Sequence, residues 1–184
     1  MTTELLGILH SIECNSENVA NVCADKLADY DYSYGANKIV IHEGNIVLKK
    51  VFNKTVKNEC QIYHKATEWN VEKFFAASML EINGVYVQEA VDITLDKYIN
   101  QLPNKIKYGA LREDYKQMGL WEMLCRSDCA VLFYLFKTYS LEDILKLQEF
   151  CVENDLNDLQ LYNAGFKDGF LKFFDYSGCE WEDM

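Results

Sequence analysis

The stretch that decides the expected fold is residues 158–175, which read DLQLYNAGFKDGFLKFFD. The dipeptide Asp168-Gly169 between two apolar runs is typical of a tight turn that joins two antiparallel strands. Because such strands run in opposite directions, the hairpin brings Asn163 and Asp175 to its open end, and Asp158 lies in the loop before it. Carboxylate and amide oxygens suit Mg²⁺. Asn and Asp are also common in turns and caps, and spacing alone favours that structural interpretation.

A second informative stretch is basic. Residues 38–57 hold five lysines and one glutamate. Alternation along the predicted strand 46–52 places one lysine on each face, so periodicity does not choose between Lys49 and Lys50. A lysine on a half-buried face needs an anionic partner, because burying an unpaired ammonium group is costly. Glu59 on the next predicted helix is one such partner and a bound phosphate is another, whereas an ordinary lysine extends its head to water.

The segment around these lysines predicts a small antiparallel sheet. Apolar, β-branched runs alternate with Gly-containing turns between residues 34 and 91, and one helix interrupts them. The expected strands are 38–42, 45–52, 79–82 and 85–91, with turns at Glu43-Gly44 and Asn83-Gly84 and a helix over 55–68.

The remaining sequence predicts mainly helices. The first 30 residues favour two helical stretches, and a short helix is expected over 94–101. Residues 119–139 are apolar nearly all round in their second half, which predicts one buried helix. Ser140 with Asp143 three residues later resembles a capping box and begins a helix over 141–153. Residues 154–160 are polar and predict a loop.

Composition excludes several classes of protein. The chain has 184 residues and a formal net charge of −11, which argues against electrostatic binding to nucleic acid. The longest apolar run, 129–136, is too short to cross a bilayer, and the N-terminus does not resemble a signal peptide. Seven irregularly spaced cysteines without a Cys-x-x-Cys pair predict reduced thiols, although Cys125 and Cys129 would share one face of a helix. We therefore expect a soluble, cytoplasmic protein that does not bind membranes.

Together these features resemble the protein-kinase-like fold over residues 34–178. The resemblance implies an α+β, truncated two-lobed fold: a small antiparallel sheet with one helix, then a mainly helical lobe with a short hairpin. It implies an N-terminal helical segment at 1–33, the first lobe at 34–93 and a reduced second lobe at 94–184. The segments that carry the resemblance are 47–49, 57–60, the hinge-like 85–90, 95–98, the catalytic-loop-like 158–163 and 173–178.

The resemblance also implies ATP and Mg²⁺ as cofactors. In it, Lys49 holds the phosphates and pairs with Glu59, Asp158 orients or deprotonates the attacking hydroxyl, and Asn163 and Asp175 bind the metal. Gly35, as the remnant of a glycine-rich loop, and Glu89, in the hinge-like strand, complete the implied nucleotide site.

Residues 158–165 and 175–178 resemble the catalytic segments of short, kinase-like proteins of bacteriophages, and this resemblance implies action in the host cytoplasm on a host component. Several positions depart from the kinase pattern. Only Gly35 remains of the glycine-rich loop, Asn157 precedes Asp158, and Gln160 replaces a cation near the transferred phosphoryl group. Because the resemblance does not extend to the later kinase helices, the N-terminal helices and residues 119–139 are expected to support the catalytic-loop-like segment in their place. The alternative is therefore a catalytically inactive kinase-fold phage protein that binds and inhibits a host protein.

Overall fold

A computed structural model describes residues 3–35, 37–52, 58–82, 84–93, 98–103 and 111–176. It shows a mixed α+β protein, so the predicted class is confirmed. The chain divides into two compact units. The first comprises 1–61, 77–90 and 179–184, and the second comprises 62–76 and 91–178. Each unit has its own apolar core.

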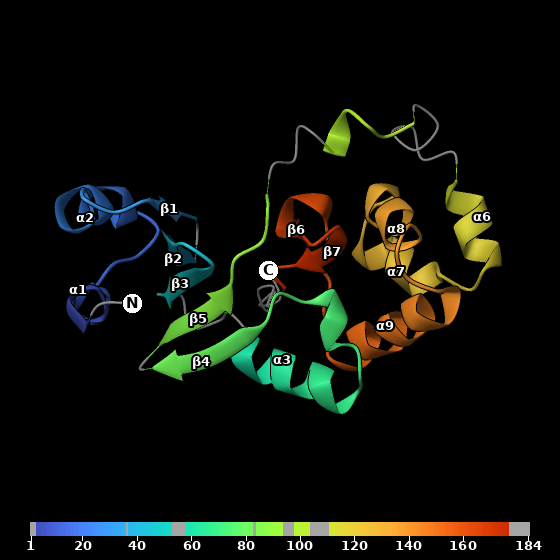
Figure 1. The fold of residues 1–184 in the computed structure, drawn as a ribbon, viewed down its shortest axis with the longest axis horizontal. Helices are drawn as coiled ribbons and strands as arrows, with labels where there is room; N and C mark the ends of the chain where they lie inside the picture. Colours follow the sequence, from blue (N-terminus) through green and yellow to red (C-terminus); the bar gives the residue numbers. More distant parts are fainter. Residues whose placement is uncertain are drawn as a thin grey trace. The chain divides into compact units, whose positions relative to one another are not determined.

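The first unit is built on an antiparallel sheet (Figure 1). Its strands follow the order β1-β2-β3-β5-β4, and the sequence analysis missed only the short β1. Glu43 pairs with Ile46, which moves the β2–β3 turn one residue later than expected. Gly44 in this turn has a φ of 61°, a conformation that favours glycine. The elements are α1 (Thr3–Ser11), α2 (Val19–Lys26), β1 (Tyr32–Tyr34), β2 (Lys38–Glu43), β3 (Ile46–Val51), β4 (Ser78–Ile82) and β5 (Val85–Glu89).

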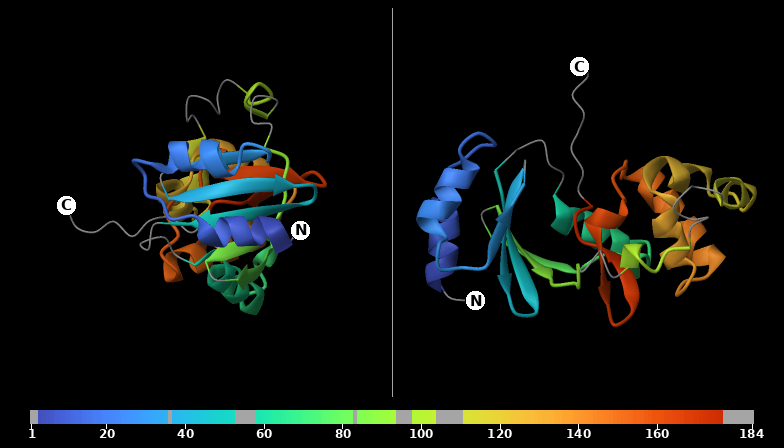
Figure 2. Two further views of the ribbon diagram at one scale, coloured as in Figure 1. Left: turned by 90° about the vertical axis from the view of Figure 1, so that its left-hand side faces the viewer. Right: turned by 90° about the horizontal axis from the view of Figure 1, so that it is seen from above.

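The two faces of this sheet differ in chemistry. On one face α1 and α2 cover an apolar surface (Figure 2), where Ile41, Leu48 and Val87 pack against helix residues such as Leu5 and Cys23. The opposite face carries buried polar side chains, which are described with the candidate site. This alternation follows from the period of two along a strand.

The second unit is mainly helical and ends in a hairpin. Its boundary with the first unit falls within α3 (Glu59–Glu68). It contains η1 (Glu72–Phe74), α6 (Arg112–Gln117), α7 (Trp121–Arg126), α8 (Cys129–Leu135), α9 (Leu141–Glu153), η2 (Leu161–Asn163), β6 (Ala164–Lys167) and β7 (Phe170–Phe173).

The single buried helix expected over residues 119–139 is wrong. Two helices, α7 and α8, occupy this segment, because Ser127 is extended and Asp128 caps α8 by accepting a hydrogen bond from the Val131 N–H at 2.8 Å. A side-chain oxygen that satisfies a first-turn amide begins a new helix. Cys125 and Cys129 therefore lie on different helices rather than on one face of the same helix.

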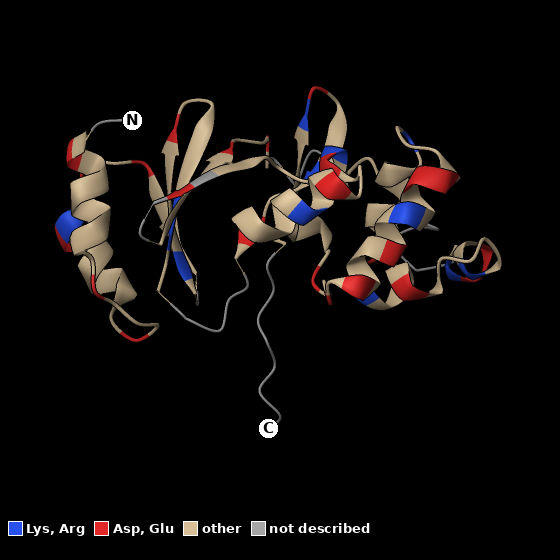
Figure 3. Cartoon of the chain, turned by 90° about the horizontal axis from the view of Figure 1, so that it is seen from below, with Lys and Arg blue, Asp and Glu red and all other residues tan. Residues whose placement is uncertain are grey.

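The last helix and hairpin agree with the sequence analysis. Helix α9 spans the expected residues, and the Ser140 hydroxyl accepts a hydrogen bond from the Asp143 N–H at 3.1 Å. Glutamates and an aspartate outnumber its one lysine (Figure 3). The β6–β7 hairpin turns on Asp168 and Gly169, whose φ values of 52° and 85° suit a two-residue turn.

Other expectations fall partly outside the described residues. These are the helix start at residue 55, the first half of the helix 94–101, the turn residue Asn83, and residues 177–178 of the kinase-like pattern. Within the described ranges no helix has the length and apolar character needed to cross a membrane. No disulfide joins the cysteines in those ranges.

Candidate functional site

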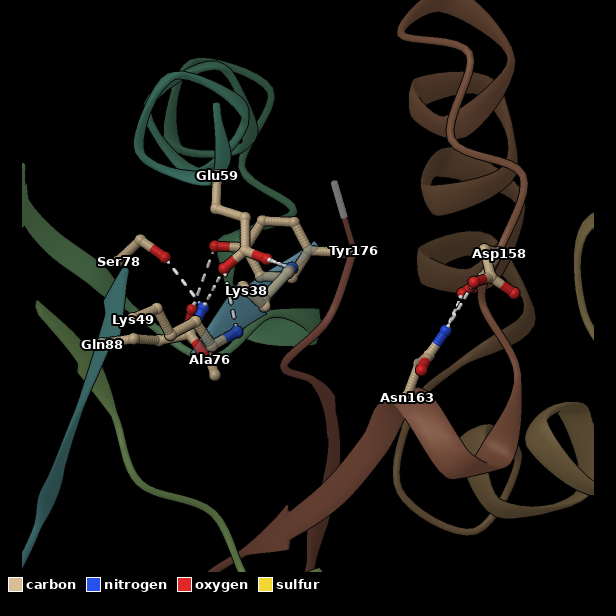
Figure 4. A network of polar contacts seen from close by, with 9 residues as sticks. All are labelled: Lys38, Lys49, Glu59, Ala76, Ser78, Gln88, Asp158, Asn163 and Tyr176. Atoms are coloured by element: carbon tan, nitrogen blue, oxygen red, sulfur yellow. Dashed lines mark hydrogen bonds and ion pairs between the residues drawn. The ribbon is translucent and has the colours of Figure 1, made fainter. Parts of the chain in front are cut away.

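The first candidate group surrounds a buried carboxylate in the sheet unit. Glu59 accepts hydrogen bonds from the Lys38 Nζ at 2.8 Å, the Lys49 Nζ at 3.0 Å and the Gln88 Nε2 at 3.0 Å (Figure 4). Gln88 Nε2 also donates to the Ser78 hydroxyl at 2.9 Å. All five residues are at least nine-tenths buried. We call Lys38, Lys49, Glu59, Ser78 and Gln88 the Glu59 cluster.

Strand register explains why these side chains converge. Val40 lies opposite Lys49, so Lys38, two residues earlier in β2, is a diagonal neighbour of Lys49 on the same face. Gln88 of β5 lies opposite Val47, which shares that face. Lys50 occupies the other face, near Cys14, where its charge lowers the pKa of that thiol against the larger effect of burial. The structure therefore resolves the choice between Lys49 and Lys50 that periodicity left open.

Electrostatics keep Glu59 ionised. Burial alone would raise the pKa of Glu59, but the charges and hydrogen bonds of Lys49 and Lys38 outweigh burial and hold that pKa below its ordinary value. The neighbouring Cys60 thiol and Tyr86 hydroxyl stay neutral. Burial and nearby carboxylates raise the pKa of Cys60 to about 11 and that of Tyr86 to about 12. The cluster thus offers fixed ammonium groups rather than a proton-transfer group.

The second candidate group lies at the open end of the β6–β7 hairpin. Asn163 Nδ2 donates to the Asp158 Oδ2 at 2.8 Å and to the Asp158 carbonyl at 2.9 Å (Figure 4). The Phe174 and Asp175 N–H groups both donate to the Asn163 carbonyl, at 2.9 and 3.4 Å. The hairpin therefore brings Asn163 and Asp175 together as its register requires. We call Asp158, Asn163 and Asp175 the Asn163 site.

Neighbouring residues fix the backbone on both sides of Asp175. Phe173, fully buried, pairs with Phe75 and accepts a hydrogen bond from the Ala76 N–H at 2.7 Å. The Tyr176 hydroxyl donates to the Ala76 carbonyl at 3.2 Å, and its ring packs against Phe75. Asp175 is half-buried between these two anchors, so its position is set by the core of this unit.

The connection between α7 and α8 supports the loop that contains Asp158. The Leu159 N–H donates to the Arg126 carbonyl at 2.9 Å, and the Arg126 guanidinium donates to the Leu156 carbonyl at 3.1 Å. Asp128, besides capping α8, accepts a hydrogen bond from the Leu161 N–H at 3.4 Å. Residues 126–128 lie within the 119–139 segment from which support of the loop was expected.

The Asn163 site has a carboxylate-rich surrounding. Tyr162 Oη lies 3.5 Å from Asp158 Oδ1. Desolvation, and after it the carboxylates of Asp158, Asp128 and Asp175, raise the pKa of Tyr162. Asp128 is thus a third carboxylate near this hydroxyl that was not identified from the sequence as a candidate.

The two other candidates, Gly35 and Glu89, lie at ends of strands in the sheet unit. Gly35 follows β1, and its N–H donates to the Lys38 carbonyl at 2.9 Å; a Cβ added there would meet no heavy atom within 4 Å. The Glu89 N–H donates to the Ala77 carbonyl at 2.8 Å, and its carboxylate accepts from the Ala77 N–H at 3.3 Å. The hydrogen bond from the Ala77 N–H to the Glu89 carboxylate therefore helps to fix the end of β5.

The chemistry of the Asn163 site fits Mg²⁺. Because the amide nitrogen of Asn163 faces Asp158, its Oδ1 is the atom that remains as an oxygen ligand, and Asp175 supplies a carboxylate. Mg²⁺ in phosphate-binding sites typically takes one or two protein oxygens together with water and phosphate. Among the described residues, no group of three or more His, Cys, Asp and Glu side chains is arranged to hold a metal. Binding of Mg²⁺ would therefore depend on the amide oxygen of Asn163 and the carboxylate of Asp175.

Sequence reasoning missed Lys38, Gln88 and Asp128. The signal for Lys38 was present, because counting back from the β2–β3 turn places it on the Lys49 face. Gln88 required the pairing of β3 with β5, which joins strands that are distant in sequence. Asp128 carried a cap signal, an Asp before an apolar run, that the strong apolar character of residues 119–139 obscured.

Comparison of the chain with models of protein families, with curated proteins and with solved structures finds no match.

Proposed function

We propose that this protein is a Mg-ATP-binding phosphotransferase with a reduced, two-lobed kinase-like fold that acts on a component of a bacterial host. The observation that carries the proposal is the Lys49–Glu59 ion pair of 3.0 Å, with side-chain exposures of 3% and 1%. A buried lysine oriented by a carboxylate is a suitable ligand for phosphate oxygens. The assignment of the metal-binding residues and of the residue that orients the acceptor hydroxyl comes from the resemblance of the sequence to kinase-like proteins.

In this proposal each named side chain has one task. Lys49 binds the α- and β-phosphates, while Glu59 orients it. Asn163 and Asp175 hold Mg²⁺, which when bound would neutralise charge on the phosphates. Asp158 orients the acceptor hydroxyl and receives its proton as the bond from that oxygen to the γ-phosphorus forms and the bond to ADP breaks. Asn163 donates hydrogen bonds to Asp158, and these bonds hold a residue that binds the metal next to the residue that orients the acceptor hydroxyl.

The test of nucleotide binding is a thermal-shift titration with Mg-ATP. A ligand at 100 times its Kd that binds only the folded protein adds about 2.7 kcal/mol to its stability. We expect Asp175→Asn and Lys49→Met to remove most of this shift, and Glu153→Ala, an exposed carboxylate on α9, to retain it. The absence of any shift in the parent protein would contradict the proposal.

A second candidate function is a catalytically inactive kinase-fold phage protein that binds and inhibits a host protein. Gln160, two residues after Asp158, favours it, because a neutral side chain there gives no charge stabilisation to a transferring phosphoryl group. Transfer of labelled γ-phosphate separates the two functions. Transfer by the parent protein that is lost in Asp158→Ala supports the phosphotransferase, whereas Mg-ATP binding without transfer supports the inactive protein.

A further inference from the structure

The hydroxyl of Tyr162 lies against Asp158, the residue that orients the acceptor hydroxyl in the proposed function. The two carboxylate oxygens of Asp158 have different partners. Oδ2 accepts a hydrogen bond from Asn163 Nδ2 at 2.8 Å (Figure 4), and Oδ1 accepts one from Tyr162 Oη at 3.5 Å. A general base acts on a hydroxyl within hydrogen-bond reach, and such bonds are often longer before the reactants are assembled. Tyr162 Oη therefore occupies a position beside Asp158 that an acceptor oxygen needs.

From this contact we infer that Tyr162 is itself a phosphate acceptor, so that the protein phosphorylates a tyrosine of its own chain. The inference rests on the proposed function, because it takes Mg-ATP as the donor and Asp158 as the base. As Tyr162 Oη forms its bond to the γ-phosphorus, the bond between that phosphorus and the oxygen of ADP breaks, and the Oη proton passes to Asp158. The products are a phosphorylated Tyr162 and ADP.

The fold holds the backbone around Tyr162 while its ring stays accessible. Leu161 and Asn163, the other two residues of η2, are buried, whereas Tyr162 is 56% exposed. The Leu161 N–H donates to the Asp128 carboxylate at 3.4 Å, and the Asn163 N–H donates to the Gln160 carbonyl at 3.0 Å. Exposed side chains change rotamer within nanoseconds, so the ring can turn on a fixed backbone. The acceptor oxygen can thus adjust to an incoming phosphate without movement of the neighbouring Asn163.

The charge around the Tyr162 hydroxyl gives Asp158 a role in the transfer. Desolvation, and after it three carboxylates, raise the pKa of Tyr162, so the hydroxyl keeps its proton near neutral pH. These carboxylates belong to Asp158, Asp128 and Asp175. A protonated phenol needs a base as it attacks phosphorus, and Asp158 is the carboxylate that accepts its hydrogen bond.

NMR spectra of isotope-labelled tyrosines test the contact without nucleotide. The signal that disappears in Tyr162→Phe identifies Tyr162, and its pH titration reports the ionisation of the hydroxyl. We expect the midpoint of this titration to fall in Asp158→Asn, because the carboxylate that accepts the hydrogen bond is then absent. Asp168→Asn, at the exposed turn of the β6–β7 hairpin, is the matched control and should leave the midpoint unchanged. An equal midpoint in the parent protein and in Asp158→Asn would overturn the inference.

Mass spectrometry after incubation with Mg-ATP tests the transfer. We expect one phosphate on the peptide that contains Tyr162, at a rate that does not depend on protein concentration, because base and acceptor belong to one chain. Tyr162→Phe and Asp158→Asn should each lose this phosphate and keep the Mg-ATP thermal shift, which would show that both variants fold and bind nucleotide. Tyr34, which is 48% exposed in the first unit, is the comparison tyrosine and should carry no phosphate.

The outcomes separate the inference from the proposed function. A Mg-ATP thermal shift without phosphate on Tyr162, or with phosphate only on other residues, overturns the inference and leaves nucleotide binding intact. A rate that rises with protein concentration also overturns it, because the transfer then occurs between chains. The absence of both the thermal shift and the phosphate overturns the proposed function, and the inference falls with it.

Discussion

Replacing Glu59 with glutamine tests whether the Glu59 cluster is a buried, charged network. The Glu59→Gln variant keeps the shape of the side chain but removes the negative charge that faces Lys38 and Lys49. Two ammonium groups with side-chain exposures of 9% and 3% then face a neutral amide. We expect a large loss of stability, because the cost of burying these charges remains while the attraction of the Glu59 carboxylate is lost.

The magnitude follows from the degree of burial. Removing one partner of a buried ion pair typically costs about 3–5 kcal/mol. For a chain of this length that corresponds to a fall in Tm of about 6–20 °C. Glu113→Gln is a contrasting control, because Glu113 pairs with Lys116 at 2.7 Å but its side chain is 73% exposed. Loss of such a surface pair costs about 1 kcal/mol or less.

Urea denaturation followed by circular dichroism measures both variants. The triple change Lys38→Met, Lys49→Met and Glu59→Met should recover much of the stability that Glu59→Gln loses, since replacing a whole buried charge network with apolar side chains is often neutral or better. Glu59→Gln that loses less than about 1 kcal/mol, like the surface control, would refute the buried network.

Three further predictions concern packing, pH and thiols. Gly165→Ala should lower the free energy of unfolding, measured with denaturant, by about 1–3 kcal/mol, because the added Cβ would lie 2.5 Å from Cγ2 of Val91. Gly35→Ala, where the added Cβ meets open space, should lower it by less than about 1 kcal/mol. Equal losses in the two variants would contradict the close approach at Gly165. The pKa of Glu59 is lowered on folding, so its contribution is fully present above its unfolded pKa and is lost as pH falls through the folded pKa. The stability gap between the parent protein and Glu59→Gln should therefore be constant near neutral pH and shrink below about 4.5, and a gap that widens in acid would be inconsistent with the ion pairs. A thiol reagent should modify the exposed Cys125 quickly in the native protein. It should modify Cys151 only on unfolding, because this thiol is buried and burial strongly raises its pKa. Equal rates of modification, measured by mass spectrometry, would contradict the packing of α9.

Local patterns predicted the elements whose signals are self-contained. The β6–β7 hairpin depends on Asp168 and Gly169, which adopt the left-handed conformations that such a turn requires. Helix α9 depends on Ser140, whose hydroxyl caps the expected first turn. In both cases the residues that decide the structure lie within a few positions of each other, so one sequence was sufficient.

The features that sequence reasoning missed depend on pairing between distant segments or on competing signals. Gln88 reaches Glu59 only because β5 pairs with β3, and no local pattern indicates that neighbour. The break between α7 and α8 was hidden because apolar residues continue on both sides of Asp128, and its cap and its bond to the Leu161 N–H became visible only in the structure. Of the candidate site, the cost of burying charge indicated Glu59 as one of two partners for a lysine of β3 and left Lys49 and Lys50 open, whereas the choice of Lys49 and the second lysine, Lys38, required the strand register.

The central claim is that the Asn163 site holds the metal ion of a bound metal–ATP complex. Replacing Mg²⁺ with paramagnetic Mn²⁺ and recording amide NMR spectra tests this claim most directly. With Mn-ATP, the amide signals of Asn163 and Phe174 should broaden strongly, and Asp175→Asn should abolish this broadening. Signals of Asn163 and Phe174 that stay sharp with Mn-ATP, or broadening that persists in Asp175→Asn, would contradict the claim.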